Sequence, residues 1–166
     1  MPPEARRPAG QIEKTNAMRV LDAKRVPYET YTYPPELHSA VEVASYLGLP
    51  PETVYKTLVV VRDRGRPMLV MVPGDRELDE RLFAQSVGEK RVAMASKAEA
   101  ERLTGLLVGG IGALALVGRK FDVFIDVLAE AHETILVNGG RRGLNLRVPV
   151  SALIALTGAR PVRATT

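Results

Sequence analysis

The chain has 166 residues, of which 46% are hydrophobic and 25% charged, a composition typical of one soluble globular domain with its own hydrophobic core. It contains no cysteine, which excludes disulfides, thiolate metal ligands and a cysteine nucleophile. The net charge of +4 is compatible with a nucleic-acid partner but does not require one. Because the only histidines are His38 and His132, a histidine-based zinc site has little support, and we expect no metal and no cofactor.

The two ends of the chain differ in composition from its middle. Residues 1–13 are rich in proline and charge, and residues 161–166 form a short polar end, so we expect flexible tails around one domain spanning residues 14–160. No secretory segment follows the first methionine, and no apolar run could span a bilayer without a charge or glycine break. The sequence therefore predicts a cytoplasmic protein with no membrane partner.

The first predicted elements are two helices with a strand between them. Thr15 is placed to cap a helix whose apolar residues follow at helical spacing, and the Tyr- and Thr-rich residues 27–33 predict a strand. Ser39 and Glu42 form a capping box, which predicts a second helix that ends at Gly48.

A hairpin and two further helices are predicted in the middle of the chain. Residues 56–72 contain two apolar runs joined by a charged turn, which indicates a hairpin. Residues 77–88 are amphipathic and predict a helix, and residues 91–95 predict a short strand. Ser96 and Glu99 form a second capping box at the start of another helix.

The last part of the chain consists of short apolar segments separated by glycines. We expect strands broken by turns from residue 106 to residue 148, and a final helix that ends at Gly158. Since strands outnumber the helices that a simple alternation would supply, and several are joined by hairpin-sized turns, the residues predict a mixed, largely antiparallel α/β fold.

Lys56 stands out because it lies at the start of the most strand-like run, "VYKTLVVV". With the period of two of a strand, it shares a face with Leu58 and Val60, while Tyr55 and Thr57 take the other face. Both faces are apolar, which indicates a strand covered on both sides. A strand-end lysine commonly extends its ammonium group into water. An uncompensated charge on an apolar face is costly, however, so a bound anion or polar ligand would explain Lys56 better.

Two glycine-rich loops are candidate sites, Val108–Gly112 and Asn138–Gly143. Their backbone N–H groups have no side chain in the way and could donate to an oxyanion or a phosphate. Arg141 and Arg142 in the second loop suit a phosphate or carboxylate ligand. The alternative, which the residues alone favour, is that both loops are tight turns between strands.

No hydrolase, metalloprotease or nucleotide-binding motif accompanies these loops. Asp122 and Asp126 are four residues apart on a predicted strand and could share a face for acid–base chemistry. Solvated strand ends are the commoner explanation for such a pair.

A set of motifs occurs in one order along the chain: "TNAMRVL", "VPYETYTY", "EVASYLGL", "VYKTLVV", "LTGLLVGGIG", "FIDV" and "TILVNGGRRGLNLRV". Together they resemble the YbaK/EbsC family of aminoacyl-tRNA deacylases, close to its Cys-tRNA(Pro) deacylase branch, over roughly residues 15–158. The resemblance implies an α+β type of α/β domain with a mixed, mainly antiparallel, barrel-like sheet flanked by helices, as in the editing domain of prolyl-tRNA synthetases.

The resemblance also implies an activity and partners. It implies a free-standing, metal-independent hydrolase of mischarged aminoacyl-tRNA, most of all Cys-tRNA(Pro), with prolyl-tRNA synthetase as a further partner. In the cysteine-specific branch the thiol of the substrate attacks its own carbonyl, so a chain without cysteine or a serine triad is consistent with this branch. The "KT" at Lys56 and Thr57 also resembles this branch more than the alanine-specific deacylases.

The resemblance assigns roles to individual residues. Lys56 would contact the 3′-terminal adenosine of the tRNA, and Gly109 and Gly110 would surround the scissile ester and offer backbone N–H donors. The substrate-binding positions would be Tyr33, Thr57, Ile111, Asn138, Gly139, Arg141, Arg142 and Asn145.

The chain departs from the family pattern in both glycine loops. Gly112 and Ala113 stand where the family usually has Ser-Pro, and Asn138 stands where the deacylase branch usually has serine. Alternatives to a Cys-tRNA(Pro) deacylase therefore stay open: a deacylase of other specificity, such as Ala-tRNA(Pro), a non-catalytic module that binds the tRNA end or a nucleotide, or a structural protein whose glycine loops are only turns.

Overall fold

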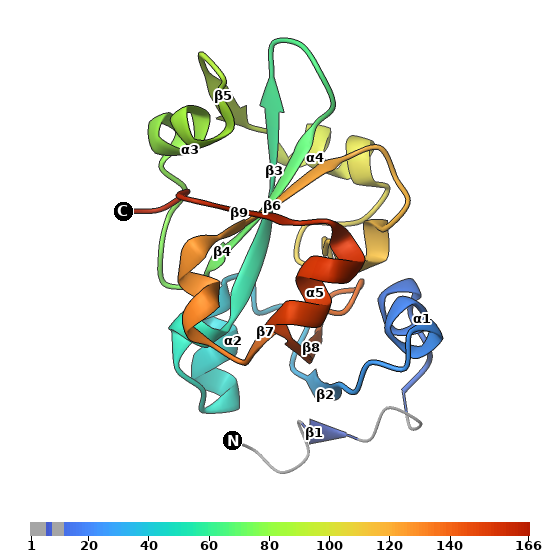
Figure 1. Ribbon diagram of the computed structural model, residues 1–166. Coiled ribbons are helices and arrows are strands. Elements are labelled where there is room, and N and C mark those ends of the chain that lie inside the picture. Colours follow the sequence, from blue (N-terminus) through green and yellow to red (C-terminus); the bar gives the residue numbers. More distant parts are fainter. Residues whose placement is uncertain (1–5, 8–11) are drawn as a thin grey trace.

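The computed structural model describes residues 6–7 and 12–166, and its strands form two sheets (Figure 1). The five-stranded sheet has the order β5 (Val92–Met94), β3 (Tyr55–Arg62), β4 (Met68–Pro73), β6 (Asp122–Asp126) and β9 (Arg160–Val162). The four-stranded sheet has the order β1 (Arg6–Arg7), β2 (Glu29–Thr32), β8 (Leu144–Pro149) and β7 (Thr134–Asn138). Most of the tail predicted over residues 1–13 lies outside the described residues.

The mixed, mainly antiparallel prediction is confirmed, because only the β4–β6 and β6–β9 pairs among the described strands are parallel. The barrel-like closure is wrong. Within the described part of the chain, the two sheets are joined by a single isolated bridge between Val54 and Leu136. After this bridge β3 pairs with β4, whereas β7 pairs with β8 along its whole length, so the sheets separate instead of closing.

Five helices flank the sheets in the described ranges, and three of them, α1 (Asn16–Ala23), α2 (Ala40–Leu47) and α4 (Lys97–Thr104), start at the predicted caps. Thr15 caps the first helix, and Ser39 and Glu42 exchange the two hydrogen bonds of a capping box. Ser96 accepts a hydrogen bond from the Glu99 amide. Each cap satisfies an amide that the first helical turn leaves without a partner. The other two helices are α3 (Glu80–Val87) and α5 (Val150–Thr157).

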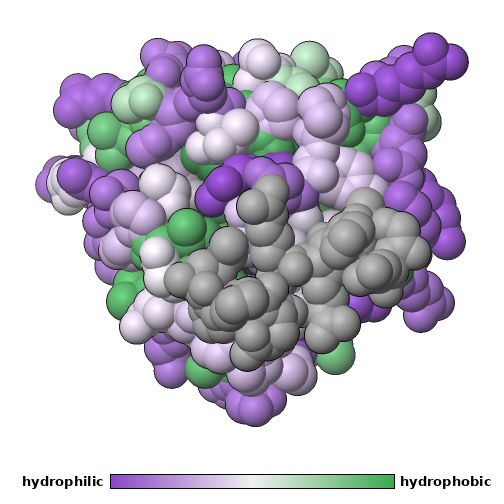
Figure 2. All heavy atoms as spheres, turned by 90° about the horizontal axis from the view of Figure 1, so that it is seen from below, coloured by the Kyte–Doolittle hydropathy of each residue, from purple (hydrophilic) through white to green (hydrophobic). Residues whose placement is uncertain are grey.

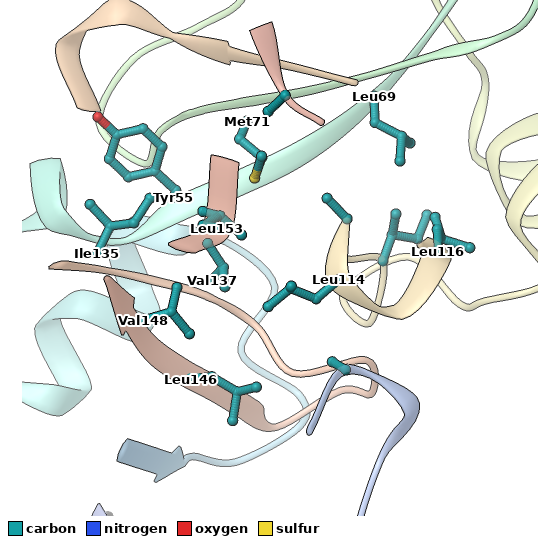
Figure 3. Close-up of a cluster of buried hydrophobic side chains, with 14 of the residues drawn as sticks. Tyr55, Leu69, Met71, Leu114, Leu116, Ile135, Val137, Leu146, Val148 and Leu153 are labelled. Atoms are coloured by element: carbon teal, nitrogen blue, oxygen red, sulfur yellow. The ribbon is translucent and has the colours of Figure 1, made fainter. Parts of the chain in front are cut away.

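The largest hydrophobic cluster lies between the two sheets (Figure 3). It also includes side chains from α5 and from a 3₁₀ helix, η4 (Leu114–Leu116). The other face of β3 contributes Val60 to a second cluster, in which Phe83 and Phe124 meet edge to face. Both faces of β3 are therefore covered, as its sequence predicts. The main cluster includes Tyr55, Leu69, Met71, Leu114, Leu116, Ile135, Val137, Leu146, Val148 and Leu153.

The segment from residue 106 to residue 118 differs from the prediction, because it contains η4 and turns where we expected strands. The Gly110 amide donates to the Leu107 carbonyl at 2.7 Å, and the Leu116 amide donates to Ala113 at 3.1 Å. These local hydrogen bonds use backbone groups that a strand would offer to a neighbour. The glycines make such turns accessible, which the apolar composition alone did not indicate.

The predicted flexible tail over residues 161–166 is wrong, because this segment is docked. β9 pairs with β6, and Ala164 is fully buried. The Asp126 carboxylate accepts hydrogen bonds from the Ala164 amide at 3.1 Å and from the Thr165 hydroxyl at 2.9 Å. Asp126 is only 1% exposed, so it holds the C-terminal segment and is neither a solvated strand end nor an accessible acid–base group.

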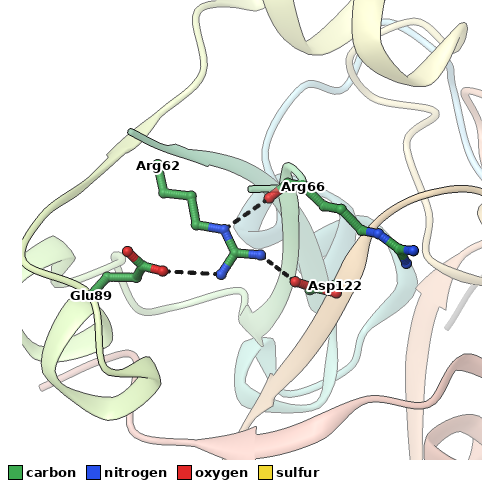
Figure 4. Close-up of polar contacts among 4 residues, drawn as sticks. All are labelled: Arg62, Arg66, Glu89 and Asp122. Atoms are coloured by element: carbon green, nitrogen blue, oxygen red, sulfur yellow. Dashed lines mark hydrogen bonds and ion pairs between the residues drawn. The ribbon is translucent and has the colours of Figure 1, made fainter. Parts of the chain in front are cut away.

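Asp122 likewise has a structural role, in a network around Arg62 (Figure 4). The Arg62 guanidinium forms ion pairs with Asp122 and with Glu89, the latter at 3.2 Å. Its Nε also donates to the Arg66 carbonyl at 3.1 Å. The network joins β3, the segment after α3 and β6, so the two aspartates of β6 do not form a catalytic pair.

The outer surface seen from below Figure 1 is mixed in character. Where the described residues are visible in Figure 2, hydrophobic residues form separate patches between hydrophilic ones. None of the helices in the described part of the chain combines the length and the apolar character that crossing a membrane requires.

Candidate functional site

A cavity of about 530 Å³ is lined by residues of both sheets. The five-stranded sheet contributes the first half of β3, and the four-stranded sheet contributes one residue each from β7 and β8. The start of α2, residues 94–97 and the glycine loop around residue 109 complete the wall. The predicted site residues that line this cavity are Tyr33, Lys56, Thr57, Gly109, Ile111, Asn138 and Asn145, whereas Gly110, Gly139, Arg141 and Arg142 do not line it.

Lys56 lies at the cavity wall, where its side chain forms a weak ion pair with Glu77. Lys56 is the second residue of β3 and lies opposite Val72 of β4, which fixes its backbone in the sheet. Its Nζ is 3.4 Å from Oε1 of Glu77. The Lys56 side chain is 24% exposed and that of Glu77 91% exposed, so the carboxylate is well solvated and the pair is a surface ion pair. An incoming anion can therefore compete with Glu77 for the ammonium group.

Tyr33 and Asn145 form a polar pair at the cavity. The Tyr33 hydroxyl donates to Oδ1 of Asn145 at 3.3 Å, and the Tyr33 amide donates to the Gly143 carbonyl at 3.0 Å. Burial raises the pKa of the Tyr33 hydroxyl to about 12. The hydroxyl is therefore protonated at neutral pH and acts as a hydrogen-bond donor.

The two glycine loops pack directly against each other. A Cβ on Gly110 would lie 3.0 Å from the Arg141 Cα, and a Cβ on Gly109 would lie 3.3 Å from the Arg142 Cγ. Gly109 also has a φ of +95°, which L side chains rarely adopt. Glycine is thus favoured at position 109 by its positive φ and at position 110 by the close approach of the backbone of the second loop.

The predicted donor groups of the first loop are only partly available. The Gly110 amide is bound to the Leu107 carbonyl and cannot donate to a substrate in this conformation. For the Gly109 amide, no acceptor is present among the residues that the structure describes. Gly109 also lines the cavity, so it is the better candidate donor of the two.

Of the two arginines predicted as anion ligands, Arg142 contacts the first loop through its side chain and Arg141 only through its backbone. The Arg142 Nε donates to the Val108 carbonyl at 2.8 Å, and the Arg141 backbone packs on Gly110. The Asn138 side chain bonds to both loops. These residues hold the loops together, which their sequence pattern did not indicate.

Several cavity residues were not predicted from the sequence. The start of α2 contributes His38, Ser39 and Val41, and residues 94–97 contribute Met94 and Lys97. The capping box predicted where α2 starts, but it did not indicate that this end of the helix lines the cavity. Ser39 Oγ accepts from the Glu42 amide as the helix cap. In the described ranges, no group of three or more histidine, aspartate or glutamate side chains is placed to hold a metal ion.

Residues 34–156 match the model of the aminoacyl-tRNA editing domain family. The chain belongs to this family. It is 33% identical to EbsC of Enterococcus faecalis, a protein assigned by its name as a Cys-tRNA(Pro)/Cys-tRNA(Cys) deacylase, over 93% of the chain and 94% of EbsC. The resemblance that the ordered motifs predicted is therefore confirmed.

Two further relatives place the domain in context. Proline–tRNA ligase of Geobacter metallireducens is 33% identical over 113 residues, which cover 68% of the chain but only 19% of the ligase. A crystal structure described as a trans-editing enzyme for prolyl tRNA synthetase has a TM-score of 0.77 at 24% identity and covers 93% of the chain and 99% of its own. This second likeness establishes the shared fold.

Proposed function

We propose that the chain hydrolyses the ester that joins an amino acid to the 3′ end of a mischarged tRNA, with Cys-tRNA(Pro) as its favoured substrate. The observation that carries the proposal is that Lys56 and Gly109, far apart in the sequence, line one cavity together with Tyr33 and Asn145. Family membership and the name of EbsC support the substrate class.

The cavity residues suit a reaction that depends on positioning. Lys56 binds the terminal adenosine, and the Gly109 amide donates to the oxygen of the ester carbonyl as negative charge develops on it. The ester is already activated, so orientation of its groups supplies much of the rate. With a cysteinyl substrate, the thiol sulfur bonds to the carbonyl carbon, the carbon–oxygen bond to ribose breaks, and the ribose oxygen takes the thiol proton. Water then opens the resulting thiolactone.

A deacylation panel with Lys56→Ala tests this proposal. We expect the wild-type chain to release amino acid from Cys-tRNA(Pro) faster than from Ala-tRNA(Pro) or Pro-tRNA(Pro). Lys56→Ala should lower kcat/KM by roughly 10- to 100-fold, because it removes a charge-assisted contact. Its free energy of unfolding should change by less than about 1 kcal/mol, since only a surface ion pair is lost.

The matched control is Lys90→Ala, because Lys90 is exposed and lies outside the cavity lining. It should leave deacylation unchanged. Undiminished hydrolysis by Lys56→Ala would remove the role that we assign to this lysine.

A second candidate function is binding of the tRNA end without hydrolysis. The engaged Gly110 amide favours it, because this amide is one donor fewer for an oxyanion. Equilibrium binding of an adenosine-ended oligonucleotide at low salt, with no release from any of the three aminoacyl-tRNAs, would support this candidate over the hydrolase.

A further inference from the structure

We propose that Asn138 and Arg142 are positioning residues that clamp the loop carrying Gly109 and do not themselves contact the substrate. Both residues occupy positions where the family resemblance implies substrate binding. The inference rests on the proposed function for its catalytic consequence, whereas the clamp itself is a property of the fold. The clamp has two parts, because the side chains of Arg142 and Asn138 form hydrogen bonds to two consecutive peptide groups of the loop.

The Asn138 side chain lines the cavity beside Tyr33, and its hydrogen bonds to the backbone all lie within the two loops. Its Nδ2 donates to the Gly109 carbonyl at 2.7 Å and to the Arg141 carbonyl at 3.3 Å, and its Oδ1 accepts from the Gly140 amide at 2.7 Å. The amide nitrogen has two hydrogens, and both are committed. The orientation of the amide follows from its partners, because carbonyl oxygens accept and a backbone amide donates.

Arg142 secures the preceding peptide. Its Nε donates to the Val108 carbonyl at 2.8 Å, and its methylene groups lie over Gly109. The Val108 carbonyl and the Gly109 amide belong to the same peptide group. Since this peptide is trans, its N–H points opposite to its carbonyl, and the Gly109 N–H is therefore directed away from Arg142.

Together the two side chains hold two successive peptides of the loop. Arg142 orients the peptide that presents the Gly109 N–H, and Asn138 binds the carbonyl of the next peptide, whose N–H is already bonded to Leu107. Gly112 and Ala113 leave this loop without the proline that the family resemblance expects, so its backbone has more freedom to lose. The clamp restricts this freedom and keeps the candidate oxyanion donor in one direction.

Asn138→Asp tests the clamp by removing both donors while keeping the acceptor for Gly140. Amide hydrogen exchange followed by NMR should show faster exchange at Gly110 and unchanged exchange at Gly140. In deacylation, kcat should fall by roughly 10- to 100-fold because the donor is displaced, with little change in KM and the same preference among amino acids. Arg142→Ala should produce the same pattern and provides a second variant if Asn138→Asp fails to fold.

Asn16→Asp is the matched control, because Asn16 is exposed and its Oδ1 accepts from Arg19 as an aspartate oxygen also would. Asn16→Asp should change neither amide hydrogen exchange at Gly110 nor the kinetics of deacylation. Unchanged exchange at Gly110 in both clamp variants would overturn the proposal, as would an altered amino-acid preference with unchanged exchange, which would indicate substrate contact. If the wild-type chain proves inactive, the proposed function fails, but the exchange experiment still decides whether the clamp exists.

Discussion

At the scale of single residues, the pairing of Lys56 with Glu77 decides how strongly the cavity can attract an anion. The lysine is largely covered, but the glutamate is almost fully solvated. A surface ion pair of this kind contributes at most about 1 kcal/mol, less than a desolvated phosphate or carboxylate contact can supply. If Lys56 binds the substrate as proposed, Glu77 competes with the substrate for its ammonium group.

Replacing this competitor should improve substrate binding. We expect Glu77→Gln to lower KM by up to about fivefold, the factor that corresponds to a surface ion pair of about 1 kcal/mol, and to leave kcat unchanged. Steady-state deacylation kinetics at low salt measure this effect. Glu52→Gln removes an exposed carboxylate outside the cavity lining and should leave KM as it is. A rise in KM for Glu77→Gln would show instead that the glutamate holds the lysine in its working position.

At the scale of elements, the C-terminal strand depends on one buried carboxylate. Asp126 ends β6, accepts from the Leu128 amide at 2.9 Å, and also binds the backbone and side chain that follow β9. The parallel pairing of β6 with β9 is short, so these hydrogen bonds carry much of the docking. β9 thereby becomes a structural edge of the five-stranded sheet.

Removing this carboxylate should release the C-terminal segment. We expect Asp126→Ala to lower the free energy of unfolding by about 3 kcal/mol, because buried amides lose their acceptor. Urea unfolding measures the loss, and limited proteolysis should show earlier cleavage near the C-terminus. Asp63→Ala, which breaks an exposed ion pair with Arg91, should cost less than about 1 kcal/mol. Equal losses in the two variants would contradict the role of Asp126.

The elements that the sequence predicted correctly are those with local signals. Thr15 and Ser39 cap helices through hydrogen bonds to amides three residues away, so the information lies within one turn of the chain. The docking of residues 161–166 depends on Asp126, which is far away in the sequence, and a short polar end contains no sign of it. The segment around η4 was missed because an apolar run broken by glycines is compatible with both strands and turns.

The candidate site was predictable to a similar extent. Period-two alternation in β3 distinguished Lys56, because the apolar residues that share its face are its neighbours in the strand. Asn138 and Arg142 form hydrogen bonds to residues about 30 positions earlier in the chain, at Gly109 and Val108. The sequence pattern alone assigned both residues to a ligand, because amide and guanidinium groups can bind either a ligand or a backbone carbonyl.

At the scale of the whole molecule, the cavity and the main core share the junction between the two sheets. Near this junction Tyr55 is buried and Tyr33 is half-buried. Burial raises the pKa of both hydroxyls, that of Tyr33 to about 12. The Tyr55 hydroxyl has no hydrogen-bond partner among the described residues. Any condition that ionises these groups therefore favours the unfolded chain, in which they are solvated.

The protein should consequently lose stability in alkali. A tyrosine in the unfolded chain ionises near pH 10, whereas Tyr33 stays neutral in the folded chain up to about pH 12. The stabilising contribution is complete below pH 10 and is lost as the pH rises from about 10 to about 12. Urea unfolding at increasing pH should show this loss, and Tyr33→Phe and Tyr55→Phe should each reduce it. Tyr46→Phe, at a partly exposed position on α2, should leave the alkaline loss unchanged.

The strand order also has a consequence for the synthesis of the protein. β2, near the start of the described chain, pairs with β8 near its end, and β8 in turn joins it to β7. A nascent chain can close the β3–β4 hairpin early, but the sheet that supplies Asn138 and Asn145 must wait until β8 has left the ribosome. Until then Tyr33 has no Asn145 to bind, and the growing chain contains no complete cavity. Premature termination before β8 should therefore leave a polypeptide without the complete cavity.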